Sequence, residues 1–343
     1  VAVVGAGAAG LTAAIRAAEA GASTVLLNAP PRIGLKILMS GGTRCNVTHR
    51  EVSERDFHGS SRHAVARVLR AFGAEDTRAW FESLGVQLKL EDTGKYYPVS
   101  DDAQTVLDAL LSAVTRAGVS IGSGARVVRI ERLEAGGFRL GIQDVGASAA
   151  FEHGRVSAPG EGAWPLPAEE PTRWIDASRV ILATGGLSFP RTGSDGTGYA
   201  LAASLGHTIV PPVPALTPLT SEDVLCGKHQ GLTFEAELTL WVDGRVAERV
   251  RGSLLLAHFG YTGPAALDLS RHWHRADAAS ERRVTLNALP GETHESVASG
   301  WVKVAKHTPQ VPLRRWFAGR LPERLLDRLC KETGVEPGAA IGQ

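Results

Sequence analysis

The first ten residues, VAVVGAGAAG, constrain the fold of this chain more than any other stretch. The apolar run Val1 to Val4 favours a β-strand, and the alanine-rich segment after Gly10 favours a helix. Gly5, Gly7 and Gly10 have the GxGxxG spacing of a dinucleotide-binding turn. The first glycine permits a tight turn, the second lets a pyrophosphate approach the backbone, and the third lets helix and strand pack closely. A strand expected at 24–27 completes a βαβ unit, so the sequence predicts a bound dinucleotide.

The end of the second strand departs from the usual dinucleotide pattern. Asp or Glu normally stands there and binds the hydroxyls of the adenosine ribose, whereas this chain has Asn28. An asparagine still accepts through its carbonyl oxygen, but it also donates and carries no charge. We therefore predict a weaker ribose contact at Asn28 and no charge repulsion of a 2′-phosphate.

Composition describes an ordinary folded chain. Hydrophobic residues make up 43% and charged residues 21% of the 343 positions, and no apolar run reaches the roughly 18 residues of a membrane helix. The 37 basic and 36 acidic side chains nearly cancel, so no overall field favours nucleic acid or a membrane. Three distant cysteines without CxxC spacing argue against zinc, disulfides and secretion. The chain starts on a strand, without methionine or a targeting peptide, so we expect a trimmed N-terminus and a cytoplasmic protein.

The segment RVILATGG, residues 179–186, indicates a second part of the nucleotide site. It is a buried strand pattern that ends in small residues, and ligands of doubly wound sheets lie at the carboxyl ends of strands. Between the two parts we expect helices around 65–84 and at 103–117, hairpin strands at 119–131 and 138–142, and an irregular excursion at 146–171. An ATG return after a β-meander is typical of FAD folds of the glutathione-reductase type.

Five segments together carry a resemblance to a known family. They are VAVVGAGAAG (1–10), GLKILMSGGTRCNVTH (34–49), YYPVSDDAQTVLDAL (96–110), ATGGLSFPRTGSDGTGYALAASLGH (183–207) and GSLLLAHFGYTGPAALDLSR (252–271). On these motifs the chain resembles the BaiN/YhiN family of FAD-dependent oxidoreductases. The resemblance implies an α/β fold, in which a glutathione-reductase-like FAD-binding Rossmann domain carries an inserted β-rich, barrel-like domain.

The proline-dense segment PPVPALTPL places the start of the insert near Pro211. We therefore expect an FAD-binding domain at 1–210 and an inserted domain with a helical end at 211–343. Alternating residues predict strands at 233–242 and 245–250, and a helix is expected at 313–330. The family returns to the FAD domain in a further glycine-rich segment, so we expect that return segment to be missing here, with weaker FAD binding.

The resemblance implies FAD contacts from several parts of the chain. Gly41 and Gly42 let backbone N–H groups approach the cofactor, and Lys36 and Arg44 offset phosphate charge. The expected cofactor-binding residues are Gly5, Ala6, Gly7, Ala9, Gly10, Asn28, Lys36, Ser40, Gly41, Gly42, Arg44, Cys45, Asn46, Val47, Thr48, Val128, Ala183, Thr184, Gly185, Gly186, Asp195 and Gly196, with the last two toward the flavin end. The family usually has glycine where this chain has Thr43, so we predict a local change of the turn, because threonine at positive φ is costly.

Cys45 and His258 are the candidate catalytic residues. No second cysteine follows Cys45, which excludes a flavin–dithiol relay. The neighbouring Arg44 would lower the pKa of the Cys45 thiol. The favoured interpretation of Cys45 is nevertheless a small packing residue beside the flavin. His258 belongs to the insert, which faces the flavin in the family, and is a candidate acid or substrate ligand. Thr262 is expected to cap the following helix, with Pro264 in its first turn.

The implied reaction is hydride transfer through FAD, with NAD(P)H as the electron donor and an activated C=C bond as the acceptor. Three alternatives stay open: a dihydrouridine synthase for 23S rRNA, an aminoacetone-type amine oxidase using O2, and a truncated non-catalytic flavoprotein fragment. Arginines within 314–328 interleave with acids, which favours a solvated helix face over an RNA track. We expect a small-molecule substrate or an rRNA uridine, no membrane partner and no metal, and the sequence indicates no oligomeric state.

Overall fold

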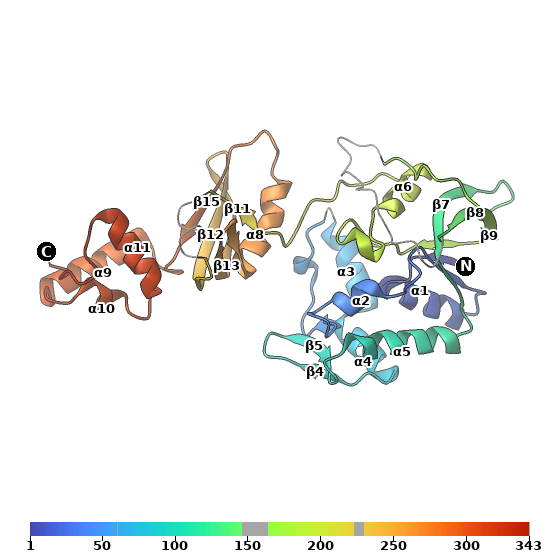
Figure 1. Ribbon diagram of the computed structural model, residues 1–343, viewed down its shortest axis with the longest axis horizontal. Helices are drawn as coiled ribbons and strands as arrows, with labels where there is room; N and C mark the ends of the chain where they lie inside the picture. Colours follow the sequence, from blue (N-terminus) through green and yellow to red (C-terminus); the bar gives the residue numbers. More distant parts are fainter. Residues whose placement is uncertain (60, 146–163, 223–229, 343) are drawn as a thin grey trace. The chain divides into compact units, whose positions relative to one another are not determined.

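The computed structural model describes residues 1–59, 61–145, 164–222 and 230–342 (Figure 1). Its contacts divide the chain into two compact units, Val1–Val210 and Pro211–Gln343. In the part of the chain that is described, no helix is both long enough and apolar enough to span a membrane.

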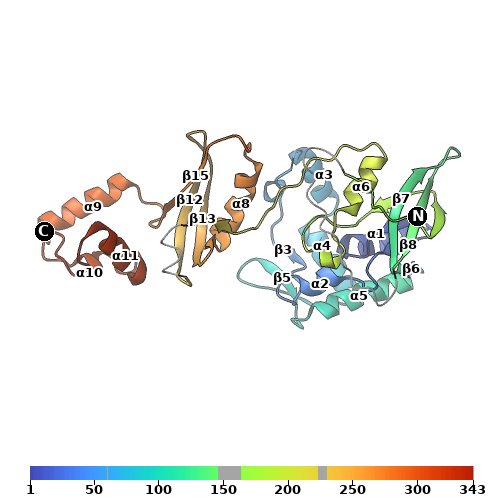
Figure 2. The ribbon, with the colours of Figure 1, turned by 45° about the horizontal axis from the view of Figure 1, so that its top comes forward.

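A four-stranded parallel sheet organises the first unit, in the order β10-β1-β2-β6. The strands are β1 (Ala2–Val4), β2 (Val25–Asn28), β6 (Ser120–Ser123) and β10 (Val180–Leu182). Helix α1 (Ala8–Glu19) and helix α5 (Ala103–Arg116) lie side by side on one face of it (Figure 2). Their apolar stripes, including Leu11, Ile15 and Leu110, are fully buried in one core cluster. Burial on both faces explains why the two central strands, β1 and β2, consist largely of apolar residues.

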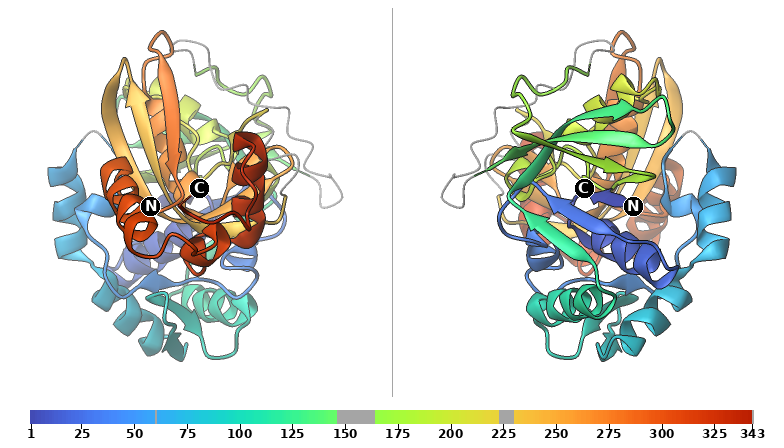
Figure 3. Two further views of the ribbon diagram at one scale, coloured as in Figure 1. Left: turned by 90° about the vertical axis from the view of Figure 1, so that its left-hand side faces the viewer. Right: turned by 90° about the vertical axis from the view of Figure 1, so that its right-hand side faces the viewer.

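An antiparallel meander covers the other face of the sheet (Figure 3). It consists of β7 (Ala125–Arg132), β8 (Phe138–Asp144) and β9 (Arg173–Ala177). The prediction of a single strand at 119–131 is wrong. The segment forms two strands, β6 and β7, which belong to different sheets. The break is at Gly124, whose φ of 69° is a left-handed value that ends an extended run. Of the excursion expected at 146–171, residues 146–163 lie outside the described part of the chain.

Smaller elements complete the first unit. A second antiparallel sheet has the order β3-β5-β4. Its strands are β3 (Thr48–His49), β4 (Leu88–Leu90) and β5 (Lys95–Pro98), and the remaining helices are α2 (Leu35–Met39), α3 (Arg62–Ala71), α4 (Ala74–Ser83) and α6 (Thr197–Ser204). The helical region expected around 65–84 is therefore two helices, and Gly73 caps the second.

The second unit contains a five-stranded antiparallel sheet in the order β11-β14-β13-β12-β15. The strands are β11 (Leu219–Thr220), β12 (Thr233–Val242), β13 (Arg245–Ala257), β14 (Gly260–Thr262) and β15 (Arg282–Asn287). Helix α8 (Pro264–Arg275) packs on the sheet through Ala265, Ala266 and Leu269. Thr262 does not cap this helix, because it pairs with Leu255 inside β14, and Gly263 with φ of 89° is the capping residue.

Three helices end the second unit: α9 (His294–His307), α10 (Leu313–Phe317) and α11 (Glu323–Thr333). The single helix expected at 313–330 is wrong, since the chain leaves the helical conformation between Phe317 and Glu323. Pro322 explains the break, because it has no N–H to donate and disfavours a helical residue before it. The expected α/β class, a Rossmann domain combined with an antiparallel β-rich domain, is confirmed.

Candidate functional site

The GxGxxG turn opens into a cavity of about 940 Å³ at the carboxyl ends of β1, β2 and β10. Gly5 has φ of 103°, and a Cβ there would overlap with the backbone of Ala183. A Cβ on Gly10 would overlap with the Gly5 carbonyl. Gly7 differs, because a Cβ would meet nothing within 4 Å. Packing thus requires glycine at two positions, whereas Gly7 leaves open space where a pyrophosphate approaches.

The N-terminus of α1 lies at this opening. Gly7 is its capping residue, and no side chain accepts a hydrogen bond from the first turn. Ala8 and Ala9 line the cavity. A helix start without a side-chain cap offers backbone N–H groups and the positive end of the helix dipole to an anion.

Asn28 is buried and its amide group is engaged inside the chain. Its Oδ1 accepts a hydrogen bond from the Ala6 N–H at 3.2 Å. Its Nδ2 donates to the carbonyl oxygens of Pro30 at 2.6 Å and Arg32 at 3.2 Å. Both N–H donors of the amide are thus used by the turn after β2, while its carbonyl oxygen holds the glycine turn.

Lys36, on α2, extends toward the loop between β10 and α6. Its Nζ donates to Ser194 Oγ at 2.7 Å and to the Ser188 carbonyl at 2.9 Å. None of its described contacts is a carboxylate, and burial lowers the pKa of its ammonium group. The residue lines the cavity, so an anion bound there would offset the cost of burying this charge.

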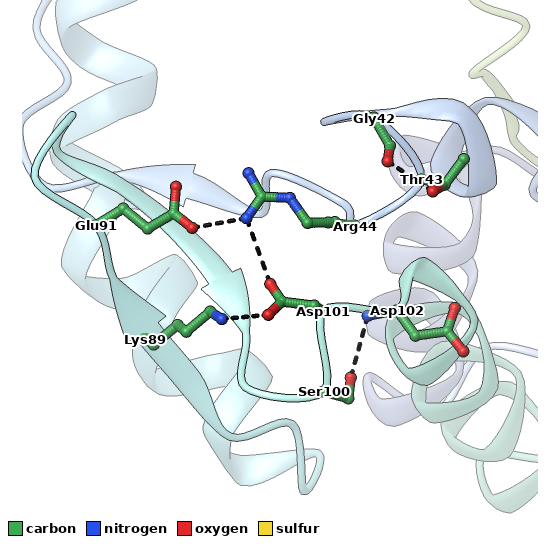
Figure 4. A network of polar contacts seen from close by, with 8 residues as sticks. All are labelled: Gly42, Thr43, Arg44, Lys89, Glu91, Ser100, Asp101 and Asp102. Atoms are coloured by element: carbon green, nitrogen blue, oxygen red, sulfur yellow. Dashed lines mark hydrogen bonds and ion pairs between the residues drawn. The ribbon is translucent and has the colours of Figure 1, made fainter.

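Arg44 has a different setting from Lys36. Figure 4 shows its guanidinium directed at the carboxylates of Glu91, at 2.6 Å, and Asp101, at 3.4 Å. Asp101 also pairs with Lys89, and the guanidinium lies 4.0 Å from the Tyr97 ring centroid. Arg44 is not among the described residues that line the cavity. Arg44 therefore joins the loop to the β4–β5 hairpin through Glu91, and its contact with phosphate stays a prediction.

The turn that precedes Arg44 is left-handed throughout. Gly41, Gly42 and Thr43 have φ of 56°, 67° and 69°, and Cys45 has φ of 61°. Thr43 therefore adopts a left-handed angle although it is not glycine, and a difference from the family's turn stays a prediction. Its hydroxyl donates to the Gly42 carbonyl at 2.6 Å, and its own carbonyl accepts from the Ala103 N–H at 2.9 Å. These contacts hold the turn against the start of α5.

Cys45 lines the cavity but is only 6% exposed. Burial raises the pKa of its thiol, and this effect exceeds the opposing hydrogen bond with Ser40. Arg44 next to it is occupied by Glu91 and Asp101. A protonated thiol packed in the wall agrees with the favoured interpretation as a packing residue. Cys226 lies outside the described residues.

His258 lies in the second unit, in the tight turn between β13 and β14. Its ring is 4.9 Å from the ring of Phe259, in an edge-to-face arrangement. The cavity is lined by residues of the first unit. The role of His258 as an acid or substrate ligand stays a prediction.

Most of the other predicted cofactor residues line the cavity. The lining residues among them are Gly5, Ala6, Gly7, Ala9, Asn28, Lys36, Ser40, Cys45, Asn46, Val47, Ala183, Thr184, Gly185 and Asp195. Those outside the lining are Gly10, Gly41, Gly42, Arg44, Thr48, Val128, Gly186 and Gly196. Val128 is fully buried in β7, and Gly196 caps α6.

Sequence reasoning missed Trp80, Phe81 and Arg126, which also line the cavity. The two aromatic residues come from α4, and their rings are 5.0 Å apart. Arg126 comes from β7 and forms an ion pair with Asp195 at 3.0 Å. The arginine in the otherwise apolar start of β7, ARVV, is a signal that could have identified it.

Comparison with known proteins covers nearly the whole chain. Residues 1–168 match the model described as "HI0933-like protein Rossmann domain", and residues 213–343 match "HI0933-like protein barrel and H2TH domain". The chain is 31% identical to the 3-dehydro-bile acid delta(4,6)-reductase of Clostridium scindens, over 96% of this chain and 74% of that one. It is 26% identical to the ribosomal RNA dihydrouridine synthase of Escherichia coli, over 99% of this chain and 75% of that one. A 3-ketosteroid-delta4-(5alpha)-dehydrogenase structure from Rhodococcus jostii RHA1 is similar at 16% identity and a TM-score of 0.42, over 60% of this chain and 53% of that one.

Proposed function

The chain belongs to the HI0933-like family, the family of the BaiN/YhiN resemblance, and is a flavin-dependent oxidoreductase; from this premise we propose that it reduces an activated C=C bond with electrons from NAD(P)H. Two relatives that act on different substrates support the proposal. A 3-dehydro bile acid has a carbonyl conjugated with the double bonds that a delta(4,6)-reductase removes. Uridine likewise has a ring carbonyl conjugated with the bond that is reduced in dihydrouridine. This shared reaction is the observation that carries the proposal.

The residues of the cavity fit FAD. Gly7 leaves space beside an uncapped helix N-terminus, and Lys36 supplies a half-buried cation without a described carboxylate partner. These groups would hold the pyrophosphate. Trp80 and Phe81 contribute apolar surface to the same cavity, which would limit the access of water to a bound cofactor.

FAD, held by the glycine turn and Lys36, would supply the two-electron chemistry by which a hydride taken from NAD(P)H reaches the carbon β to the carbonyl. The α carbon must then receive a proton from the chain or from water. We propose His258 as the donor, since the Cys45 thiol is packed into the cavity wall. The α1 N-terminus, which lines the cavity, would orient the cofactor through its backbone N–H groups.

The test is an anaerobic assay of the purified chain with FAD and NADPH, and with a 3-keto-Δ4 steroid as the acceptor. We expect NADPH to be consumed only when the steroid is present. Gly7→Ala should abolish turnover and flavin binding, while Gly59→Ala, also in open space, should change neither. A chain that binds no flavin contradicts the proposal. Hydrogen peroxide formed from aminoacetone and O2, without NADPH, would instead support the amine oxidase alternative.

A dihydrouridine synthase is the second candidate, favoured by the Escherichia coli relative and by exposed basic residues of the helical end. Lys303 and Lys306 lie on α9, and neither has a carboxylate within the ion-pair distance among the described residues. Against this, Arg314 pairs with Asp327, as expected for a solvated face. Dihydrouridine formed on 23S rRNA by the purified chain would distinguish this candidate from a small-molecule reductase.

A further inference from the structure

The cavity has an unusual distribution of acidic groups. Asp195 is the one carboxylate among the described residues that line it. The end of β2, where a dinucleotide fold normally has its ribose-binding acid, has Asn28 instead, and both amide N–H donors of Asn28 are used within the chain. A sugar hydroxyl is recognised best by a charged acceptor, because such hydrogen bonds are about twice as strong as neutral ones.

Asp195 lies near the end of β2 although it is distant in sequence. A Cβ built on Gly193 would be 3.0 Å from the Pro30 ring, so the loop that carries Asp195 packs against the turn after β2. Pro30 is also the residue whose carbonyl accepts from Asn28. The loop that carries Asp195 therefore lies close to the end of β2, the part of a Rossmann domain that binds the adenosine ribose.

Arg126 holds the Asp195 carboxylate in place. Its Nη2 donates to Asp195 Oδ2 at 3.0 Å and to Thr197 Oγ1 at 3.2 Å. The backbone N–H of Thr197 donates to Asp195 Oδ1 at 3.0 Å. The two charged side chains are only 18% and 8% exposed. A buried, hydrogen-bonded pair of this kind fixes the orientation of both partners.

We infer that Asp195 accepts a hydroxyl of the adenosine ribose of FAD, in place of the acid that Asn28 does not provide, and that Arg126 is the positioning residue for this contact. The inference rests on the proposed flavin chemistry. Asp195 lines the cavity, so its carboxylate is placed next to a group bound there. Asn28 would then hold the glycine turn, and Asp195 would bind the ribose. In other dinucleotide-binding domains the acid at the end of the second strand binds the ribose.

The experiment compares the affinity of the chain for FAD with its affinity for two analogues, in which the adenosine ribose lacks the 2′- or the 3′-hydroxyl. Flavin fluorescence quenching or calorimetry gives the dissociation constants without any turnover. We expect at least one analogue to bind about tenfold more weakly, the size of one charge-assisted hydrogen bond. Asp195→Asn and Arg126→Met should weaken FAD binding and reduce that tenfold preference. Arg126→Lys, which keeps the cation, should restore much of it.

Glu169→Gln is the matched control, because Glu169 lies 3.7 Å from Arg126 but is 41% exposed and does not line the cavity. It should leave the preference unchanged. Equal binding of FAD and both analogues by the unaltered chain overturns this inference and leaves the proposed function intact. A folded Asp195→Asn chain that keeps the full preference also overturns it. Absence of FAD binding by the unaltered chain overturns the proposed function, and this inference with it.

Discussion

Two glycine-containing turns of the first unit obtain similar backbone freedom in different ways. In the Gly5–Gly10 turn, glycine stands wherever packing excludes a Cβ. In the turn at 41–45, left-handed angles also occur at Thr43 and Cys45, which are not glycines. Contacts from elsewhere, including the Arg44 ion pairs and the Ala103 N–H, hold this second turn. The first turn is determined by its own sequence, and the second by its tertiary neighbours.

The largest expected effect tests the first turn. Gly10→Ala would drive a Cβ into the Gly5 carbonyl, so either the helix or the turn must move. We expect a loss of about 3 kcal/mol in the free energy of unfolding, the upper range for overpacking. Urea denaturation followed by circular dichroism measures it. Gly7→Ala is the control, because its Cβ meets open space and stability should change by less than about 0.5 kcal/mol. Equal losses of unfolding free energy in the two variants would show that packing does not distinguish Gly10 from Gly7.

The same distinction explains how much the sequence could predict. The βαβ unit, α5 and β12 were predictable because motif, helical period and alternation are local signals. The break at Gly124 and the helix end before Pro322 also have local causes, but they were hidden inside longer apolar patterns. Local patterns identify elements more reliably than they identify the sheet to which a strand belongs.

The site residues follow the same rule. Gly5, Gly7 and Gly10 were predictable, since each has a steric reason within the motif. Arg126 has only the local signal of a charge in an apolar strand, and its role was not predictable, because its partner Asp195 is 69 residues away in the chain. The ion pairs of Arg44 were not predictable for the same reason: its acidic partners come from the β4–β5 hairpin and the turn before α5. A charged side chain in a motif has a role only once its partners are known.

An intermediate effect is expected when the anchor of the second turn is removed. Arg44→Met keeps the apolar stem over Tyr97 but loses the ion pairs with Glu91 and Asp101. The turn should loosen, and FAD affinity should fall by about two- to fivefold, since partly exposed pairs contribute little each. Arg50→Met is the control, because Arg50 lies 3.7 Å from Glu51 in an exposed pair. Unchanged FAD affinity in Arg44→Met would mean that the turn keeps its shape without this anchor.

The smallest effect, and the most direct test of the comparison, is expected at Thr43. A left-handed conformation costs an ordinary residue about 1–2 kcal/mol, whereas glycine adds an entropic cost of roughly 0.5–1 kcal/mol. Because Thr43 has φ of 69°, Thr43→Gly should stabilise the chain by up to about 1 kcal/mol. Thr308→Gly, at an exposed position with φ of −141°, should destabilise it, because no strain is relieved there. Both are measured by urea denaturation. A loss of stability in Thr43→Gly would mean that the hydroxyl contact with the Gly42 carbonyl outweighs the strain, and that the second turn depends on its own side chains as much as on its neighbours.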